Sequence, residues 1–342
     1  ILDLNRLAVN DGLSAPVVGA IGDRISRGEQ SLVFVNRRGF APVVVCTECG
    51  WQALCPRCDA RQTLHRRTGR VICHHCGSQA LLPAKCPQCH TPGLFAVGEG
   101  TQRVEEALVR IFPKARVMRI DSDVAGPAEE IARALEAVRE REVDILVGTQ
   151  MLSKGHDFAG VTLVCVLSAD QGLYSLDFRG PERLSQQLAQ VSGRAGRRDS
   201  PGAVLVQTSH PESPAFARLK THDFVGFAKE ALIERKAAGY PPYARFALMR
   251  AESTQSGAPM TFLRSAALAG EALSYRKAVE IMAPVPSPME RRAGRFRAQL
   301  LVRSKDEHRF HRFLDNWLQG IESSRGATAV RWSIDVDPQE MY

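Results

Sequence analysis

The stretch that decides the fold is VDILVGTQMLSKGHDFAGVTLVCVLSAD, residues 143–170. It contains two short apolar runs, 143–149 and 161–169, separated by a polar segment. Apolar runs of this length are typical of strands that are buried on both faces of a parallel sheet. In such sheets ligands gather at the carboxyl ends of the strands. The segment GTQMLSKGHDF, residues 148–158, begins at such an end and is therefore a candidate binding loop.

Strand-like and helix-like segments alternate on both sides of this stretch. Further strands are predicted at SLVFVNRRG (31–39), ARVMRI (115–120) and AVLVQT (203–208), and helices at 101–112, around 128–139 and at 181–192. In the first helix Thr101 is a candidate N-cap, and Val104, Ala107, Leu108 and Ile111 lie on one face. Residues 1 to about 210 are therefore predicted to form a doubly wound parallel sheet of the α/β class.

Composition describes an ordinary globular chain with a moderate positive charge. The 342 residues are 44% hydrophobic, and 45 Lys and Arg against 37 Asp and Glu give a net charge of +8. This charge favours a nucleic-acid partner, although it also serves solubility. There is no apolar run of about 18 residues, so we expect no membrane partner and a cytoplasmic location. Because the chain begins at Ile1 rather than Met, we also expect it to be a fragment of something longer.

Eight of the nine cysteines form four C-x-x-C pairs, which we call knuckles. One knuckle supplies two thiolates to a zinc ion, so four knuckles predict two structural sites with four cysteine ligands each. A disulfide framework is not favoured, because it would require an oxidising compartment and a small secreted chain. Redox chemistry is not favoured either, because redox C-x-x-C motifs come singly. The ninth, Cys165, is predicted to be a buried core residue.

The pairing of the knuckles has two alternatives. Nested pairing places the outer two knuckles on one ion (Cys46, Cys49, Cys86 and Cys89) and the inner two on the other (Cys55, Cys58, Cys73 and Cys76). Sequential pairing would leave only residues 50–54 between two knuckles of one site, which is cramped. The inner spacing C-x2-C-x14-C-x2-C is close to that of zinc ribbons, so the nested arrangement is favoured.

Two further motifs give the chain a family resemblance. QVSGRAGRR, residues 190–198, resembles motif VI of superfamily 2 helicases, and ILVGTQMLSKGHDFAGVTLV, residues 145–164, resembles motif V. With SLVFVNRRGFAPVVVC running into four knuckles and the tail IDVDP, the order is similar to the second motor lobe and C-terminal region of the PriA family of primosomal replication-restart helicases. No G-x-x-x-x-G-K-[ST] loop is found, since Gly-Lys never occurs. In that family the phosphate-gripping loop belongs to the first lobe.

The resemblance implies roles for individual residues. The complete protein would bind ATP and Mg²⁺. The motif VI side chains that would face the triphosphate are Gln190, Arg194 and Arg197. The glycines Gly193 and Gly196 would let the backbone approach phosphate closely. The motif V residues would couple nucleotide state to grip on a DNA strand: Gly148, Thr149, Gln150, Lys154, Gly155 and Asp157.

The function that follows from the resemblance belongs to the complete protein. It would be an ATP-dependent 3′-to-5′ DNA helicase that recognises stalled or abandoned forks and initiates primosome assembly. Its partners would be forked and single-stranded DNA, single-stranded-DNA-binding protein and other primosome proteins, in the nucleoid. Two alternatives remain open: a zinc-containing fork-binding scaffold with a degenerate motor, and a zinc-ribbon platform that docks proteins.

The C-terminal third has a different pattern. After a segment at 211–239 that is predicted to be largely helical, strands and helices follow in the order βαββαβ, which predicts a ferredoxin-like α+β domain. Its loop PMERRAGRFR, residues 288–297, holds Arg291, Arg292, Arg295 and Arg297 around Phe296 and is a candidate for phosphate contact and base stacking, or a solvated hairpin. The predicted domains are a RecA-like lobe at 1–43 and 92–215, a zinc insert at 44–91, and a DNA- or partner-binding domain at 216–342.

Overall fold

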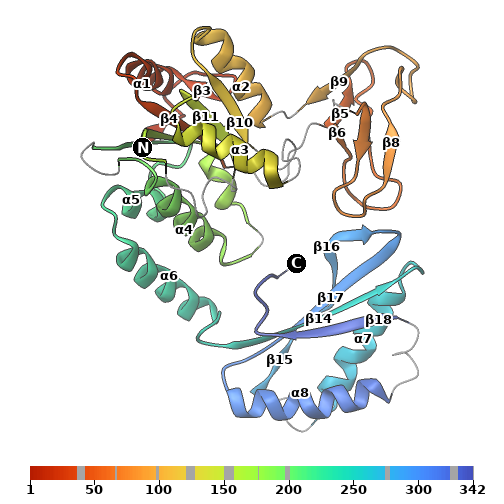
Figure 1. Ribbon diagram of the computed structural model, residues 1–342. Coiled ribbons are helices and arrows are strands. Elements are labelled where there is room, and N and C mark those ends of the chain that lie inside the picture. Colours follow the sequence, from red (N-terminus) through yellow and green to blue (C-terminus); the bar gives the residue numbers. More distant parts are fainter. Residues whose placement is uncertain are drawn as a thin grey trace. The chain divides into compact units, whose positions relative to one another are not determined.

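The computed structural model divides the chain into two compact units (Figure 1). Unit 1 comprises Ile1–Pro42 and Ala96–Ala228, and unit 2 comprises Val43–Phe95 and Lys229–Tyr342. The structure describes residues 1–36, 43–65, 68–97, 100–120, 128–149, 158–175, 177–196, 201–273, 278–323 and 330–341. No helix within these ranges is long and apolar enough to cross a membrane.

Unit 1 is built on a six-stranded parallel sheet. In spatial order its strands are β1 (Leu2–Asp3), β13 (Ala203–Thr208), β12 (Val161–Leu167), β4 (Gln30–Val35), β11 (Ile145–Gly148) and β10 (Val117–Ile120). A small antiparallel pair, β2 (Val9–Asn10) and β3 (Leu13–Ser14), precedes the first helix. Every residue of β4, β11 and β12 is buried, which explains why these strands lack polar alternation.

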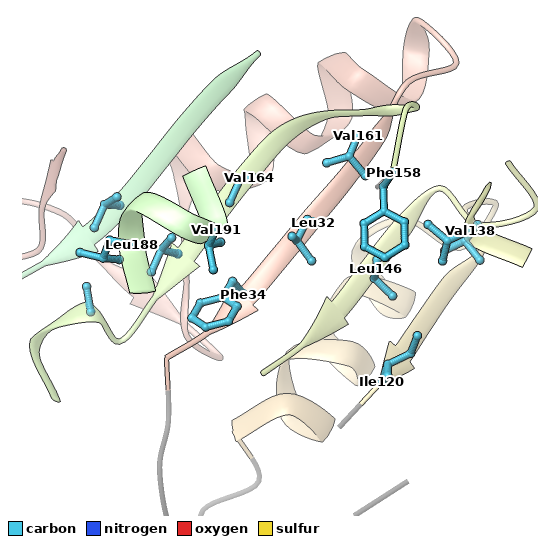
Figure 2. Close-up of a cluster of buried hydrophobic side chains, with 14 of the residues drawn as sticks. Leu32, Phe34, Ile120, Val138, Leu146, Phe158, Val161, Val164, Leu188 and Val191 are labelled. Carbon is cyan, nitrogen blue, oxygen red and sulfur yellow. The ribbon is translucent and has the colours of Figure 1, made fainter. Parts of the chain in front are cut away.

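Helices cover both faces of this sheet. They are α1 (Ala15–Ser26), α2 (Gly100–Ile111), α3 (Ala128–Arg139), α4 (Gly180–Ser192) and α5 (Pro214–Lys220), with a short 3-10 turn at Ala169–Gly172. Successive residues of β4 point to opposite sides: Val33 packs with α1 and α2, whereas Leu32 and Phe34 pack with α3 and α4. Figure 2 shows Leu32 and Phe34 in the second of these cores, with Leu188 and Val191 of α4.

The predicted doubly wound parallel sheet is therefore confirmed. Cys165 lies in its core as predicted, with no exposed surface, and burial raises the pKa of its thiol to about 12. Two details of the prediction for α2 were wrong. The helix begins at Gly100, so Thr101 lies inside it, and Ile111 is 41% exposed because the helix ends there, beyond the surface that Val104 and Leu108 cover.

The N-terminal part of unit 2 is the zinc module, an antiparallel sheet that carries the four knuckles. Its strands lie in the order β8 (Gln79–Leu81), β7 (Arg70–Ile72), β6 (Thr63–His65), β5 (Val43–Cys46) and β9 (Leu94–Val97). Its apolar core is small, with Val44, Ala53 and Val71 buried. A core of this size rarely holds a fold together alone, so metal ions are expected to supply much of its stability.

The C-terminal part of unit 2 is an antiparallel sheet whose apolar face is covered by two helices (Figure 1). After α6 (Phe224–Ala238) come β14 (Arg245–Ser253), α7 (Ala258–Glu271), β15 (Glu280–Ile281), β16 (Val285–Arg292), β17 (Arg295–Ser304), α8 (Glu307–Glu322) and β18 (Arg331–Val336). The strand order β15-β17-β14-β18, with β16 also on β17, agrees with the predicted ferredoxin-like domain.

One local detail of the predicted βαββαβ order was wrong. Residues 279–287, VEIMAPVPS, read as one strand in that order, but the chain breaks between Ile281 and Val285, around Pro284. Of the two alternatives for residues 288–297, the structure shows the hairpin, in which β16 pairs with β17 up to Arg292. Its turn consists of Ala293 (φ 53°) and Gly294 (φ 81°), and positive φ at both central residues is the geometry that matches strand twist in two-residue turns.

Candidate functional site

The eight paired cysteines form two clusters of thiols. Within each cluster all four Sγ atoms lie within 4.8 Å of one another, and the clusters are Cys46, Cys49, Cys86 and Cys89, which we call the outer site, and Cys55, Cys58, Cys73 and Cys76, the inner site. The predicted nested pairing is confirmed. Individual Sγ···Sγ distances are 3.5 Å for Cys46–Cys89 and 3.6 Å for Cys55–Cys76. Zinc–sulfur bonds of about 2.3 Å in a tetrahedron give sulfur–sulfur distances near 3.8 Å, so both sites fit Zn²⁺.

All four knuckles share a backbone hydrogen bond. The N–H of the first cysteine donates to the carbonyl five residues further on: Cys46 to Trp51, Cys55 to Ala60, Cys73 to Ser78 and Cys86 to Thr91, each at 2.8 Å. This bond folds each C-x-x-C segment into a tight turn with both sulfurs on the same side.

The protein environment affects the thiols unequally. The backbone N–H of Cys49 is the main cause that lowers the pKa of Cys46 to about 6, and that of Ser78 lowers the pKa of Cys76 to about 7. Burial instead raises the pKa of Cys58 to about 12. A divalent cation would favour the thiolate form at all of these positions. Sites with four cysteine ligands have no open coordination position, so their role would be to fold the module rather than to perform chemistry.

The described part of motif V lies at the carboxyl end of β11. Gly148, the last residue of that strand, is buried and is paired with Phe34, and Thr149 follows it half-buried. Gln150, Lys154, Gly155 and Asp157 lie outside the described residues. The chain is described again at Phe158, which is buried beside Val161 and Leu146 (Figure 2). Within motif V, Gly148 at the end of β11 and Phe158 before the start of β12 therefore lie toward opposite edges of the sheet.

Motif VI lies at the end of α4. Gln190 is exposed on the last turn of the helix, and Arg194 follows it half-buried, while Arg197 lies outside the described residues. Gly196 has a φ of 67°, a conformation that favours glycine, and its N–H donates to the carbonyl of Val161 at 3.2 Å. This hydrogen bond attaches the motif VI turn to the first residue of β12.

Gly193 does not need to be glycine for conformational reasons. It caps α4 with a φ of −66°, within the range of any residue. The predicted close approach of its backbone to phosphate stays a prediction.

Gly148 and the motif VI turn lie toward opposite edges of the sheet, because the turn is bonded to Val161 at the start of β12. Val161 is paired with Gln30 at the start of β4, whereas Gly148 is paired with Phe34, four residues further along the same strand. Four steps of about 3.3 Å separate these levels by about 13 Å. Gly148 and the hydrogen bond that holds the motif VI turn are therefore separated by most of the length of the central strands.

Sequence reasoning missed two buried contacts near motif VI, one at the start of α4 and one against the motif VI turn. Asp177 is fully buried before α4, where its Oδ1 accepts a hydrogen bond from the N–H of Arg179 at 2.9 Å and its Oδ2 lies 3.3 Å from Nη2 of Arg183. Gly202 packs its Cα directly against the motif VI turn, because an added Cβ would lie 2.3 Å from the carbonyl carbon of Ala195. The contacts of Asp177 are local, to Arg179 and Arg183, whereas Gly202 meets the turn at Ala195 and Gly196.

Three family models match the chain in succession. They are the PriA DNA helicase Cys-rich region domain at residues 55–80, the Helicase conserved C-terminal domain at 95–199 and the Primosomal protein N C-terminal domain at 236–339. The Replication restart protein PriA of Haemophilus influenzae is 38% identical over 342 residues, which is 100% of this chain and 46% of that protein. The protein of the same name from Bacillus subtilis is 37% identical over 96% of this chain and 41% of its own length.

The chain belongs to the PriA family. A third relative in the family, Replication restart protein PriA of Synechocystis, is 39% identical over 93% of this chain and 38% of its own length. The chain thus spans less than half the length of these curated relatives. Its zinc clusters and its parallel sheet agree with the Cys-rich and helicase C-terminal domains of the family.

Proposed function

We propose that this chain is the C-terminal part of an ATP-dependent superfamily 2 DNA helicase that acts in replication restart. The complete protein would recognise stalled or abandoned forks, unwind duplex DNA in the 3′-to-5′ direction and initiate primosome assembly. The observation that carries this proposal is the succession of PriA Cys-rich, helicase and primosomal domains along one chain. The alternative, a scaffold with a degenerate motor, is not favoured, because relatives named for replication restart align over the whole chain.

Within that function, the motif VI turn would face the triphosphate. Arginine guanidinium groups are always charged and present a planar fork of donors, which suits them to offset charge on a transferred phosphoryl group. The carboxyl end of β11 would face the DNA strand, because motif V begins there with a half-buried Thr149. The sheet would then carry two ligands at opposite edges, with ATP and Mg²⁺ at the amino edge. Single-stranded-DNA-binding protein and other primosome proteins are the proposed protein partners.

The proposal is tested by replacing Arg194 or Arg197 with Ala in the complete protein. ATP turnover should fall on the order of a thousandfold, as for arginine fingers elsewhere, while fork binding stays within about tenfold. Arg110→Ala is the matched control, since that side chain is 67% exposed on α2 and pairs only with the surface residue Asp11 among the contacts described. Polarity is read in the same preparation from partial duplexes that carry a single-stranded tail on one strand or the other.

Two results would contradict the proposal. Loss of fork binding with normal turnover would place the arginines on the nucleic acid instead of the nucleotide. Complete protein without any DNA-stimulated ATP turnover, but with tight and salt-dependent binding to forks, would support the scaffold.

A further inference from the structure

The inner zinc site contains one knuckle that differs from the other three. In those three the residue after the second cysteine has a positive φ: 72° at Gly50, 71° at Gly77 and 59° at His90. Each of these residues donates its N–H back to the carbonyl of its own first cysteine, at 3.0, 2.8 and 2.9 Å. The three knuckles thus close themselves.

Asp59 occupies the same place in the remaining knuckle, Cys55–Cys58, and does not have a positive φ. Its N–H donates instead to the carbonyl of Arg291 at 2.8 Å, and its carboxylate accepts the N–H of Arg291 at 2.5 Å. Arg291 belongs to β16 of the C-terminal domain. The N–H that closes each of the other knuckles internally therefore donates here to a residue 232 positions away in the sequence.

The ligand sulfurs show the same substitution. In the other knuckles the second cysteine is hydrogen-bonded to the backbone N–H two residues further on: Cys49 to Trp51, Cys76 to Ser78 and Cys89 to Thr91. At Cys58 the N–H of Ala293 donates to Sγ at 3.1 Å. Ala293 is the first residue of the hairpin turn, in the left-handed conformation with a φ of 53°.

Further contacts hold the turn against the knuckle. Gly294 donates its N–H to the carbonyl of Arg57 at 2.7 Å, and the Arg57 guanidinium donates to the carbonyl of Ala293 at 3.2 Å. Met289 of β16 packs against the cluster of Cys55, Cys58 and Cys73. The turn and the knuckle are therefore joined both by backbone–backbone hydrogen bonds and by side chains of the knuckle.

We propose that the turn Arg291–Gly294 is a built-in part of the inner zinc site. It supplies to the Cys55–Cys58 knuckle the backbone hydrogen bonds that the other three knuckles make for themselves. The ribbon is then joined to the C-terminal domain through one of its own metal ligands. Retention of the inner ion depends on the hairpin, whereas retention of the outer ion does not.

Zinc release into excess chelator, followed with a chromogenic zinc indicator, separates the two sites. Cys58→Ser in the intact chain, which should hold only the outer ion, identifies the kinetic phase of each site. Ala293→Pro removes the N–H that donates to Cys58 and is incompatible with the positive φ. Loss of partners that orient metal ligands typically weakens metal binding 10–100-fold. We therefore expect the inner phase to become about tenfold faster, with the outer phase unchanged.

Three further variants test the reasoning and control for the fold of the hairpin. Ala293→Gly keeps the N–H and accepts a positive φ, so it should release zinc like the unmodified chain. Asp59→Ala removes the carboxylate that accepts from Arg291 and leaves the hairpin sequence intact, and it should also speed only the inner phase. Asp59→Gly gives the knuckle the glycine that closes two of the others, and in the Ala293→Pro background it should slow the inner phase again.

The proposal is overturned if Ala293→Pro and Asp59→Ala leave both phases unchanged, or if they speed both phases equally. It is also overturned if Asp59→Gly fails to restore slow release, since the knuckle would then not be lacking its own closure.

Discussion

The contact of Gly202 with motif VI predicts a loss of activity from one added methyl group. A Cβ at this position would lie 2.3 Å from the carbonyl carbon of Ala195 and 2.4 Å from the nitrogen of Gly196. Carbon contacts are favourable only from about 3.5 Å, so the turn or the start of β13 must move by about 1 Å. Both clashing atoms are backbone, and Gly196 is also bonded to Val161, so no rotamer change can relieve the contact.

The expected result of Gly202→Ala in the complete protein is a turnover defect that exceeds its stability defect. A displacement of about 1 Å in a group that acts on the reacting atoms can lower a rate about a hundredfold. Overpacking typically destabilises by about 1–3 kcal/mol, which is only several degrees of melting temperature for a unit of this size. ATP turnover and thermal unfolding are measured on the same preparation, with fork binding as a third readout.

Gly19→Ala is the matched control. Gly19 is exposed on α1, where an added Cβ meets nothing within 4 Å. This substitution should leave turnover unchanged and stabilise the helix by about 0.5–1 kcal/mol. The reasoning is refuted if Gly202→Ala turns over ATP at the normal rate, or if it loses fork binding as severely as turnover.

Other predictions follow from the absent phosphate loop and from two ion pairs. This chain alone should hydrolyse no ATP, because the residues that grip the β- and γ-phosphates and Mg²⁺ are not in it; DNA-stimulated turnover by the purified chain would contradict this. Asp177→Asn should destabilise the chain by about 1–3 kcal/mol, since it removes a fully buried carboxylate that lies 3.3 Å from Nη2 of Arg183, and urea unfolding measures the loss. The hydrogen bond from Arg116 lowers the pKa of Asp144 in the folded chain. The ionised Asp144 therefore adds to the free energy of unfolding above the unfolded pKa of about 3.9, and this contribution is lost as the pH falls below that value. Asp144→Asn should flatten the acid end of the plot of unfolding free energy against pH.

Much of the parallel sheet could be predicted because each of its strands is a local signal. The predicted strand 203–208 coincides with β13, and the predicted helix 128–139 coincides with α3. The pairing of the cysteine knuckles could be predicted as well, because the short segment 50–54 makes sequential pairing cramped and the inner spacing is close to that of zinc ribbons. The prediction that Ile111 lies on the buried face of its helix was wrong for a different reason. Helical periodicity indicates the face on which a residue lies, but not whether the sheet beneath extends that far.

The contacts that complete the sites could not be read from the sequence. The arginines at 291–297 were interpreted as a candidate nucleic-acid loop, yet Arg291 pairs with Asp59 and the neighbouring turn contacts Cys58. The knuckle and the turn are 235 positions apart, and no periodicity or spacing encodes a contact of that kind. The predicted domain boundaries and the roles of motifs V and VI stay predictions.

The separation of the two motifs has a consequence for how the lobe would work. A ligand at the amino edge and another at the carboxyl edge of one sheet can affect each other through the strands that connect the edges. All residues of β4, β11 and β12 are buried, and closely packed strands resist bending. The motif VI turn is bonded to the first residue of β12, and β12 and β11 are both paired with β4. A displacement of motif VI would therefore shift the start of motif V by moving unit 1 as a rigid body, rather than by deforming its sheet.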